Sequence, residues 1–129
     1  MSQELTLPCP TCGSEGAMRI GQSALRGRLR WYRSIDCSAC GRSEEDGEGF
    51  PPEPIRKTLL ESGESVLQID PQFKAGAARL LKSALGLSLA EVSTRLASLP
   101  EVFRGTRTEV EWLQSKAKSD ATPATIATR

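Results

Sequence analysis

The chain has 129 residues, of which 38% are hydrophobic and 26% charged, and its formal net charge is +1. No apolar run approaches the roughly 18 residues that cross a bilayer, so the composition predicts a globular chain without a membrane partner. A charge so close to balance gives no general attraction for nucleic acid, and the absence of histidine removes the commonest catalytic base.

All four cysteines lie in two Cys-x-x-Cys pairs, Cys9 with Cys12 and Cys37 with Cys40. Two such pairs let four thiolates converge on one ion, because a two-residue spacer allows the backbone to curl around the metal. A glycine follows each pair, where the turn favours a backbone conformation that glycine adopts without steric cost. The pattern predicts a structural Zn²⁺ with these four cysteines as ligands and no open position for catalysis. Residues 6–45 thereby resemble a four-cysteine zinc ribbon, and we expect this domain to cover residues 1–50.

Disulfide bonds and a redox-active Cys-x-x-Cys are the alternative explanations of these cysteines. Residues 1–7 are polar and do not show the basic start and apolar run of a secretory signal, which favours a reducing cytoplasm. A thioredoxin-like motif would lie in a βαβ context, which the surrounding sequence does not predict. We therefore expect a cytoplasmic, zinc-binding protein.

The segment between the cysteine pairs predicts a hairpin, with strands at residues 17–20 and 29–35 and a tip at residues 21–27. Alternation along the second strand places Leu29, Trp31, Arg33 and Ile35 on one face and Arg30, Tyr32 and Ser34 on the other.

The same hairpin is rich in arginine and carries two aromatic residues. Such a surface binds nucleic acid when arginines follow the phosphates and a base stacks on a ring. The alternative is that Trp31 fills a core while the arginines form a solvated face. The candidate contacts are Arg26, Arg28, Arg30, Trp31, Tyr32 and Arg33.

Two charged and breaker-rich stretches follow the hairpin. Residues 44–48 carry four acidic side chains, and we expect a solvated turn that pairs with hairpin arginines, with a separate binding patch as the alternative. Residues 51–64 are expected to form a proline-containing connector with a short helix at residues 55–62, ended by Gly63.

The C-terminal half shows explicit helix signals after a predicted strand at residues 65–70. Asp70 as N-cap and Pro71 at the first helical position begin a helix that continues to about Leu85, and Gly86 ends it. Further strands are predicted at residues 101–104 and 124–128.

Two capping boxes are predicted, in which a hydroxyl residue and a glutamate three positions later satisfy each other's backbone amides. Ser88 with Glu91 begins a second helix that ends before Pro100. Thr108 with Glu111 begins a third helix that continues to about Ser119.

The resulting order of strand, helix, helix, strand, helix and strand predicts a small α/β sandwich over residues 65–129, and an α+β fold class for the whole chain. The stretch Gly86-Leu87-Ser88-Leu89-Ala90-Glu91, with Pro100 and Gly105 beyond it, resembles the C-terminal domain of the bacterial ribosomal stalk protein. The fold is also similar to that of the adaptor of the bacterial Clp protease.

The stalk resemblance implies a docking surface for a protein partner. That family uses basic residues on its first two helices to dock translational GTPases. The corresponding candidates here are Lys74, Arg79 and Lys82.

The sequence shows no nucleophile with a base, no glycine-rich phosphate loop and no paired carboxylates at a defined site. We therefore expect a non-enzymatic, zinc-stabilised protein-binding module without a small-molecule substrate. The alternatives are a nucleic-acid-associated factor in translation or transcription, and an immunity or inhibitor protein that blocks one cognate protein.

Overall fold

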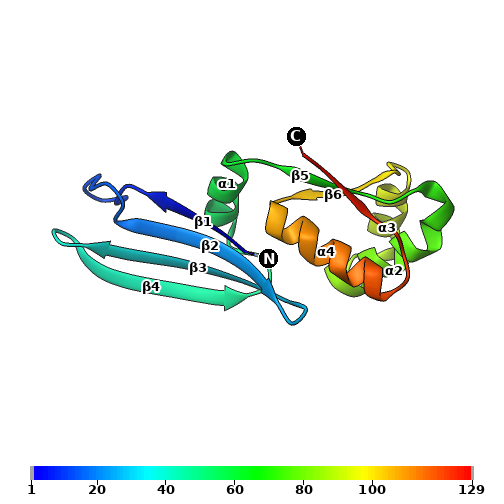
Figure 1. Ribbon diagram of the computed structural model, residues 1–129, viewed down its shortest axis with the longest axis horizontal. Helices are drawn as coiled ribbons and strands as arrows, with labels where there is room; N and C mark the ends of the chain where they lie inside the picture. Colours follow the sequence, from blue (N-terminus) through cyan, green and yellow to red (C-terminus); the bar gives the residue numbers. More distant parts are fainter. Residues whose placement is uncertain (1, 129) are drawn as a thin grey trace. The chain divides into compact units, whose positions relative to one another are not determined.

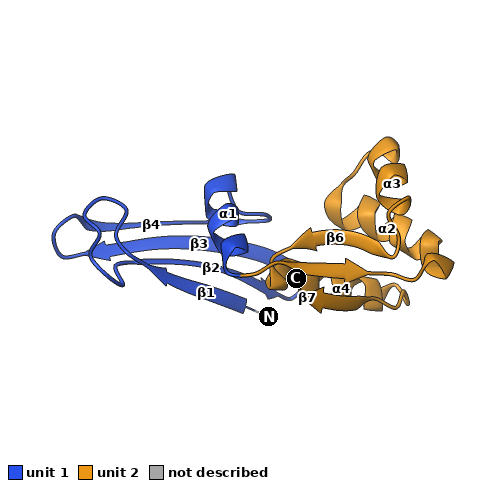
Figure 2. Cartoon of the chain, turned by 90° about the horizontal axis from the view of Figure 1, so that it is seen from above, with its two compact units in different colours: residues 1–62 blue, residues 63–129 orange. Residues whose placement is uncertain are grey.

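The computed structural model describes residues 2–128 and divides the chain into two compact units, Met1–Ser62 and Gly63–Arg129 (Figure 2). Each unit combines an antiparallel sheet with helices, which confirms the predicted mixed α+β class (Figure 1). Among the helices of residues 2–128, none is long and apolar enough to cross a membrane.

The first unit is a four-stranded sheet in the order β1-β2-β3-β4, followed by one helix. Its elements are β1 (Ser2–Leu7), β2 (Met18–Leu25), β3 (Arg28–Cys37), β4 (Gly41–Glu48) and α1 (Glu53–Glu61).

The predicted hairpin of β2 and β3 is present, but its tip is much shorter than residues 21–27. Arg26 and Gly27 both have positive φ, 54° and 76°, as a two-residue hairpin turn requires, so the strands continue to Leu25 and Arg28. Gly21 lies within strand β2 and not in a turn. A Cβ at this position would come within 2.4 Å of the Tyr32 ring, so the glycine makes room for a cross-strand aromatic side chain.

The acidic run forms strand β4, so the prediction of a solvated turn is wrong there. Acidic residues have low intrinsic strand preference, which hides the strand in the sequence. Neighbouring basic residues of β3 compensate, since Arg33 pairs with Glu45 across the strands and Arg28 lies 3.8 Å from Glu48. The predicted pairing with hairpin arginines is thus observed.

The core of the first unit lies between the sheet and α1. Ile20 of β2 and Ile55 and Leu59 of α1 are almost fully buried there. Trp31 packs against the same cluster, together with the partly buried side chains Leu5, Leu7 and Met18.

The second unit is a three-stranded sheet in the order β6-β5-β7 with three α-helices. The predicted order of strand, helix, helix, strand, helix and strand is observed, and α4 packs against α2 and the sheet. The elements are β5 (Ser65–Gln68), the 3₁₀ turn η1 (Pro71–Phe73), α2 (Lys74–Leu85), α3 (Leu89–Leu96), β6 (Glu101–Gly105), α4 (Arg107–Ser119) and β7 (Thr125–Thr128).

The first helix start differs from the prediction. Asp70 accepts a hydrogen bond from the amide of Gln72 at 3.0 Å, but it caps the turn η1, and α2 begins only at Lys74. Gly86 ends α2 with a φ of 64°, as predicted.

One of the two predicted capping boxes is confirmed and the other is displaced. Ser88 and Glu91 exchange hydrogen bonds of 3.2 and 3.1 Å at the start of α3. At α4 the box is made by Thr106 and Glu109, with both bonds 3.1 Å long, so the assignment to Thr108 is wrong. Both threonines are followed by glutamate after three residues, and the pattern alone does not choose between them.

Candidate metal centre

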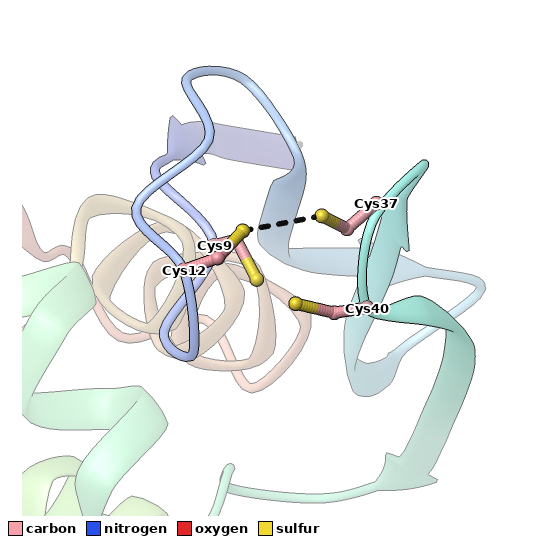
Figure 3. A group of neighbouring side chains, drawn as sticks. All are labelled: Cys9, Cys12, Cys37 and Cys40. Carbon is pink, nitrogen blue, oxygen red and sulfur yellow. Dashed lines mark hydrogen bonds between the residues drawn. The ribbon is translucent and has the colours of Figure 1, made fainter.

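The four cysteines meet at one end of the first sheet (Figure 3). Cys9 and Cys12 lie in the loop between β1 and β2, while Cys37 ends β3 and Cys40 precedes β4. The connection from β1 to β2 and the connection from β3 to β4 lie at the same end of the antiparallel sheet. The topology therefore brings the two cysteine pairs together. Cys9 and Cys37 are buried, and Cys12 and Cys40 are exposed.

The sulfur geometry fits one metal ion. All four Sγ atoms lie within 4.8 Å of one another, and those of Cys12 and Cys37 are 3.4 Å apart. A tetrahedral ion with metal–sulfur bonds of about 2.3 Å would place its ligands about 3.8 Å apart, which lies between these values. The cysteines are free thiols with no disulfide among them, and their spacing is consistent with a metal ion site.

Backbone amides at each turn favour the thiolate of the first cysteine in the pair. Hydrogen bonds from the backbone of Cys12 and Thr11 lower the pKa of Cys9. Those from Ala39 and Cys40 lower the pKa of Cys37 in the same way. A lowered pKa supplies the deprotonated sulfur that a metal requires.

The two exposed cysteines, Cys12 and Cys40, have pKa values shifted in opposite directions. The hydroxyl of Ser14, whose oxygen lies 3.1 Å from Sγ, lowers the pKa of Cys12 together with the backbone of Ser14. The hydrogen bond between Cys40 and Cys12, with burial and the other nearby thiols, raises the pKa of Cys40 to about 12. A metal ion at this site would displace the proton of the Cys40 thiol, because metals bind the thiolate.

The glycine after each pair has the conformation that the sequence predicts. Gly13 and Gly41 have φ values of 78° and 96°, and no heavy atom lies within 4 Å of the position of an added Cβ. The requirement for glycine at these positions is therefore conformational. Gly13 also donates to the carbonyl of Cys9 at 2.8 Å, which closes the first turn.

The candidate nucleic-acid contacts do not form one surface. Alternation along β3 places Arg28, Arg30 and Tyr32 on the face opposite α1, whereas Trp31 and Arg33 lie on the face that α1 covers. Arg26 lies in the hairpin turn.

The arginines of this hairpin also lie beside the acidic strand. Arg28 and Arg33 have glutamate partners in β4, and Arg30 lies directly opposite Glu48. The Tyr32 hydroxyl donates to the carboxylate of Glu4. The positive charge expected from the sequence is therefore largely balanced within the sheet.

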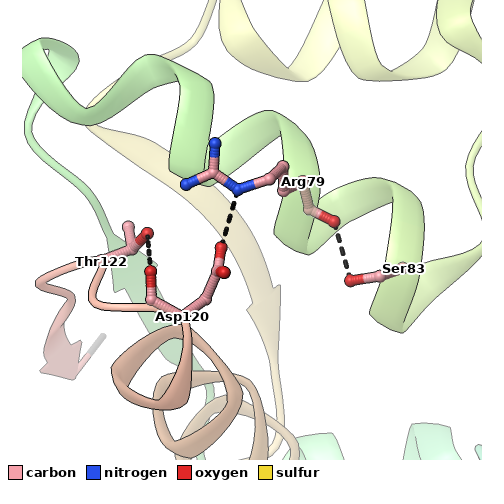
Figure 4. Close-up of polar contacts among 4 residues, drawn as sticks. All are labelled: Arg79, Ser83, Asp120 and Thr122. Atoms are coloured by element: carbon pink, nitrogen blue, oxygen red, sulfur yellow. Dashed lines mark hydrogen bonds and ion pairs between the residues drawn. The ribbon is translucent and has the colours of Figure 1, made fainter.

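A second candidate site lies in the second unit, in a groove between α2 and the end of α4. Its volume is about 670 Å³, and its charged lining includes Arg79 and Lys82, two of the three predicted docking residues. Arg79 Nε donates to Asp120 Oδ2 at 2.9 Å (Figure 4). Lys74, the third, lies at the start of α2 and does not line this groove.

Sequence reasoning missed the contribution of α4 to this groove. Lys116, Ser119 and Asp120 line it opposite α2. The spacing of Lys116 and Ser119 places them on one side of a helix, but nothing in the sequence shows that this side faces α2.

The protein is thus a two-unit α+β protein with a four-cysteine cluster that fits a metal ion in one unit and a cationic groove in the other. Comparison of the chain with protein-family models, curated proteins and solved structures finds no match. The resemblance to the ribosomal stalk protein therefore stays a prediction.

Proposed function

We propose that this protein is a non-enzymatic, zinc-stabilised module that binds a protein partner through the groove between α2 and α4. The observation that carries the proposal is the excess of cations in this groove, where Arg79, Lys82 and Lys116 outnumber the one acidic residue, Asp120. Electrostatic complementarity of this kind guides a partner's approach and fixes its register.

The metal centre has a structural role in this proposal. Four sulfur donors in tetrahedral arrangement suit zinc or iron, and a complete set of cysteines leaves no open position for water or substrate. Zinc would hold together the two loops that carry the cysteines. A reducing cytoplasm would keep the four thiols available for the metal.

The test is affinity capture from the native host, with nuclease-treated and untreated arms. A protein partner should survive the nuclease, and Arg79→Glu with Lys82→Glu should reduce its recovery at least tenfold. The matched control is Arg28→Glu with Arg30→Glu on the hairpin, which should leave recovery unchanged.

Binding of oligonucleotides is the result that would contradict this proposed function. If labelled oligonucleotides bind tightly, lose affinity steeply as salt rises, and fail only with the hairpin variant, the protein is a nucleic-acid-associated factor instead.

A further inference from the structure

We infer that the groove between α2 and α4 binds a short acidic segment of the partner, and that Asp120 occupies the position of one carboxylate of that segment. This inference rests on the proposed function, and it adds the chemistry of the ligand and the residues of α4. The occupant is an extended peptide that carries carboxylates and at least one apolar side chain.

The charge of the groove favours an anion. Arg79 is paired with Asp120, and these side chains are 60% and 49% exposed, so solvent screens the pair and a competing carboxylate can exchange with Asp120. Within residues 2–128, Lys82 has no acidic partner. Its ammonium group is therefore available to a ligand.

Lys116 supplies a third cation from the opposite wall of the groove. Its Nζ lies 5.2 Å from the centroid of the Trp112 ring, and this cation–π contact holds the side chain along α4. A ligand carboxylate that reaches Lys116 would then bridge the two helices.

The hydroxyl groups of the groove argue against a single compact anion such as phosphate. Ser83 Oγ donates to the carbonyl of Arg79 at 2.8 Å, and Ser119 Oγ donates to that of Ser115 at 3.2 Å. Both hydroxyl protons are therefore engaged by the helices, as Figure 4 shows for Ser83. The cationic donors come instead from two helices, an arrangement that suits several carboxylates along a peptide.

The size and the apolar lining of the groove also favour an extended peptide. A volume of about 670 Å³ lies in the range of about 300–1,000 Å³ that holds drug-sized ligands, so several side chains fit. Leu80 contributes an apolar side chain to the lining. An apolar residue between the carboxylates of the segment would contact it.

The experiment uses the full chain and a fluorescein-labelled octapeptide of four glutamates, two leucines and two glycines, with glutamine in place of glutamate in the control peptide. Fluorescence anisotropy should show binding of the acidic peptide and at least tenfold weaker binding of the control. Affinity should fall as salt rises, because the pairs are exposed.

Groove variants then assign the site. Lys82→Glu and Lys116→Glu should each weaken binding of the acidic peptide at least fivefold, whereas Lys118→Glu, the same charge change at a position of α4 outside the groove lining, should leave it unchanged. Asp120→Asn should strengthen binding severalfold, because it removes the internal competitor. Circular dichroism checks that each variant is folded.

Three results would overturn the inference: no binding of the acidic peptide, equal weakening by Lys118→Glu and Lys116→Glu, or displacement of the peptide by inorganic phosphate at concentrations where glutarate has no effect. If the peptide fails but Arg79→Glu with Lys82→Glu still abolishes capture of the partner, the acidic ligand is wrong and the proposed function stands. If the peptide fails and the double variant captures the partner as well as the wild type does, the acidic ligand and the proposed function are both wrong.

Discussion

Individual residues at the metal centre divide into ligands and groups that tune the ligands. Cys12 is an exposed ligand candidate, and Ser14 lowers its pKa through a contact of 3.1 Å between Oγ and Sγ. The serine is not itself a sulfur donor. The two positions therefore separate the loss of a metal ligand from a change in its surroundings.

Cys12→Ser should lose the metal, whereas Ser14→Ala should keep it. Structural zinc sites bind with about 10–16 kcal/mol at neutral pH, and in small domains this becomes folding free energy. We expect one zinc per chain in the wild type and in Ser14→Ala, measured by elemental mass spectrometry, and a clearly lower melting temperature for Cys12→Ser. Equal metal content and melting in Cys12→Ser would refute the zinc assignment.

Tyr32 allows a test of the polar face of the first sheet, because it is the only tyrosine in the chain. Burial, with the hydrogen bond and charge of Glu4, raises the pKa of Tyr32 to about 12 from an ordinary value of 10.0. The folded protein thus holds this proton more tightly than the unfolded chain. The associated stability is complete below pH 10 and declines as pH rises toward 12.

A spectrophotometric titration of the phenol should therefore have its midpoint well above that of the same protein in denaturant. Glu4→Gln should lower the midpoint only in part, because burial is the larger cause and remains. The matched control is Glu15→Gln, which removes a carboxylate without changing the contact between Glu4 and Tyr32. A midpoint that does not respond to Glu4→Gln would show that Glu4 and Tyr32 do not interact.

Helix starts set the limits of sequence reasoning at the scale of elements. Ser88 was identifiable because Glu91 follows it and Gly86 ends the preceding helix. At α4 the same pattern occurs twice, and the structure places the capping box at Thr106 and Glu109. Thr108 and Glu111 match the same local pattern, so the sequence could not choose between the two starts.

The capping boxes predict different costs for removing a hydroxyl. Ser88→Ala should lower the free energy of unfolding by about 1 kcal/mol. Thr106→Ala should lower it by about 2 kcal/mol, because it leaves the buried amide of Glu109 without its acceptor. Thr94→Ala removes an exposed hydroxyl within α3 and should cost nothing measurable. Denaturant unfolding of the second unit checks these values, and equal midpoints for Thr106→Ala and Thr94→Ala would contradict the cap.

The strands were less predictable than the helices, for a physical reason. Strand β4 consists mostly of charged residues, and its place in the sheet depends on the basic strand beside it, as the pair Arg33 and Glu45 shows. The metal ligands, by contrast, depend on short-range spacing that the sequence displays directly. The groove residues of α4 depend on helix packing, which only the structure shows.

At the scale of the whole molecule, the two units have separate means of stabilisation. The first has a small core around Ile20 and Leu59, and a domain of this size usually needs a staple such as a metal. The second buries Leu67, Leu81 and Leu113 within its own helices and sheet. Loss of the metal should therefore affect the two units unequally.

The chain's two tryptophans make this inequality measurable, because Trp31 belongs to the first unit and Trp112 to the second. Trp112→Phe leaves Trp31, which packs against the core of the first unit, and Trp31→Phe leaves Trp112, which is 8% exposed in α4. A zinc chelator should shift the emission of Trp31 to the red and leave that of Trp112 unchanged, and added zinc should reverse the shift. If both reporters change together, the units fold as one cooperative body; if neither changes, the metal does not stabilise the first unit.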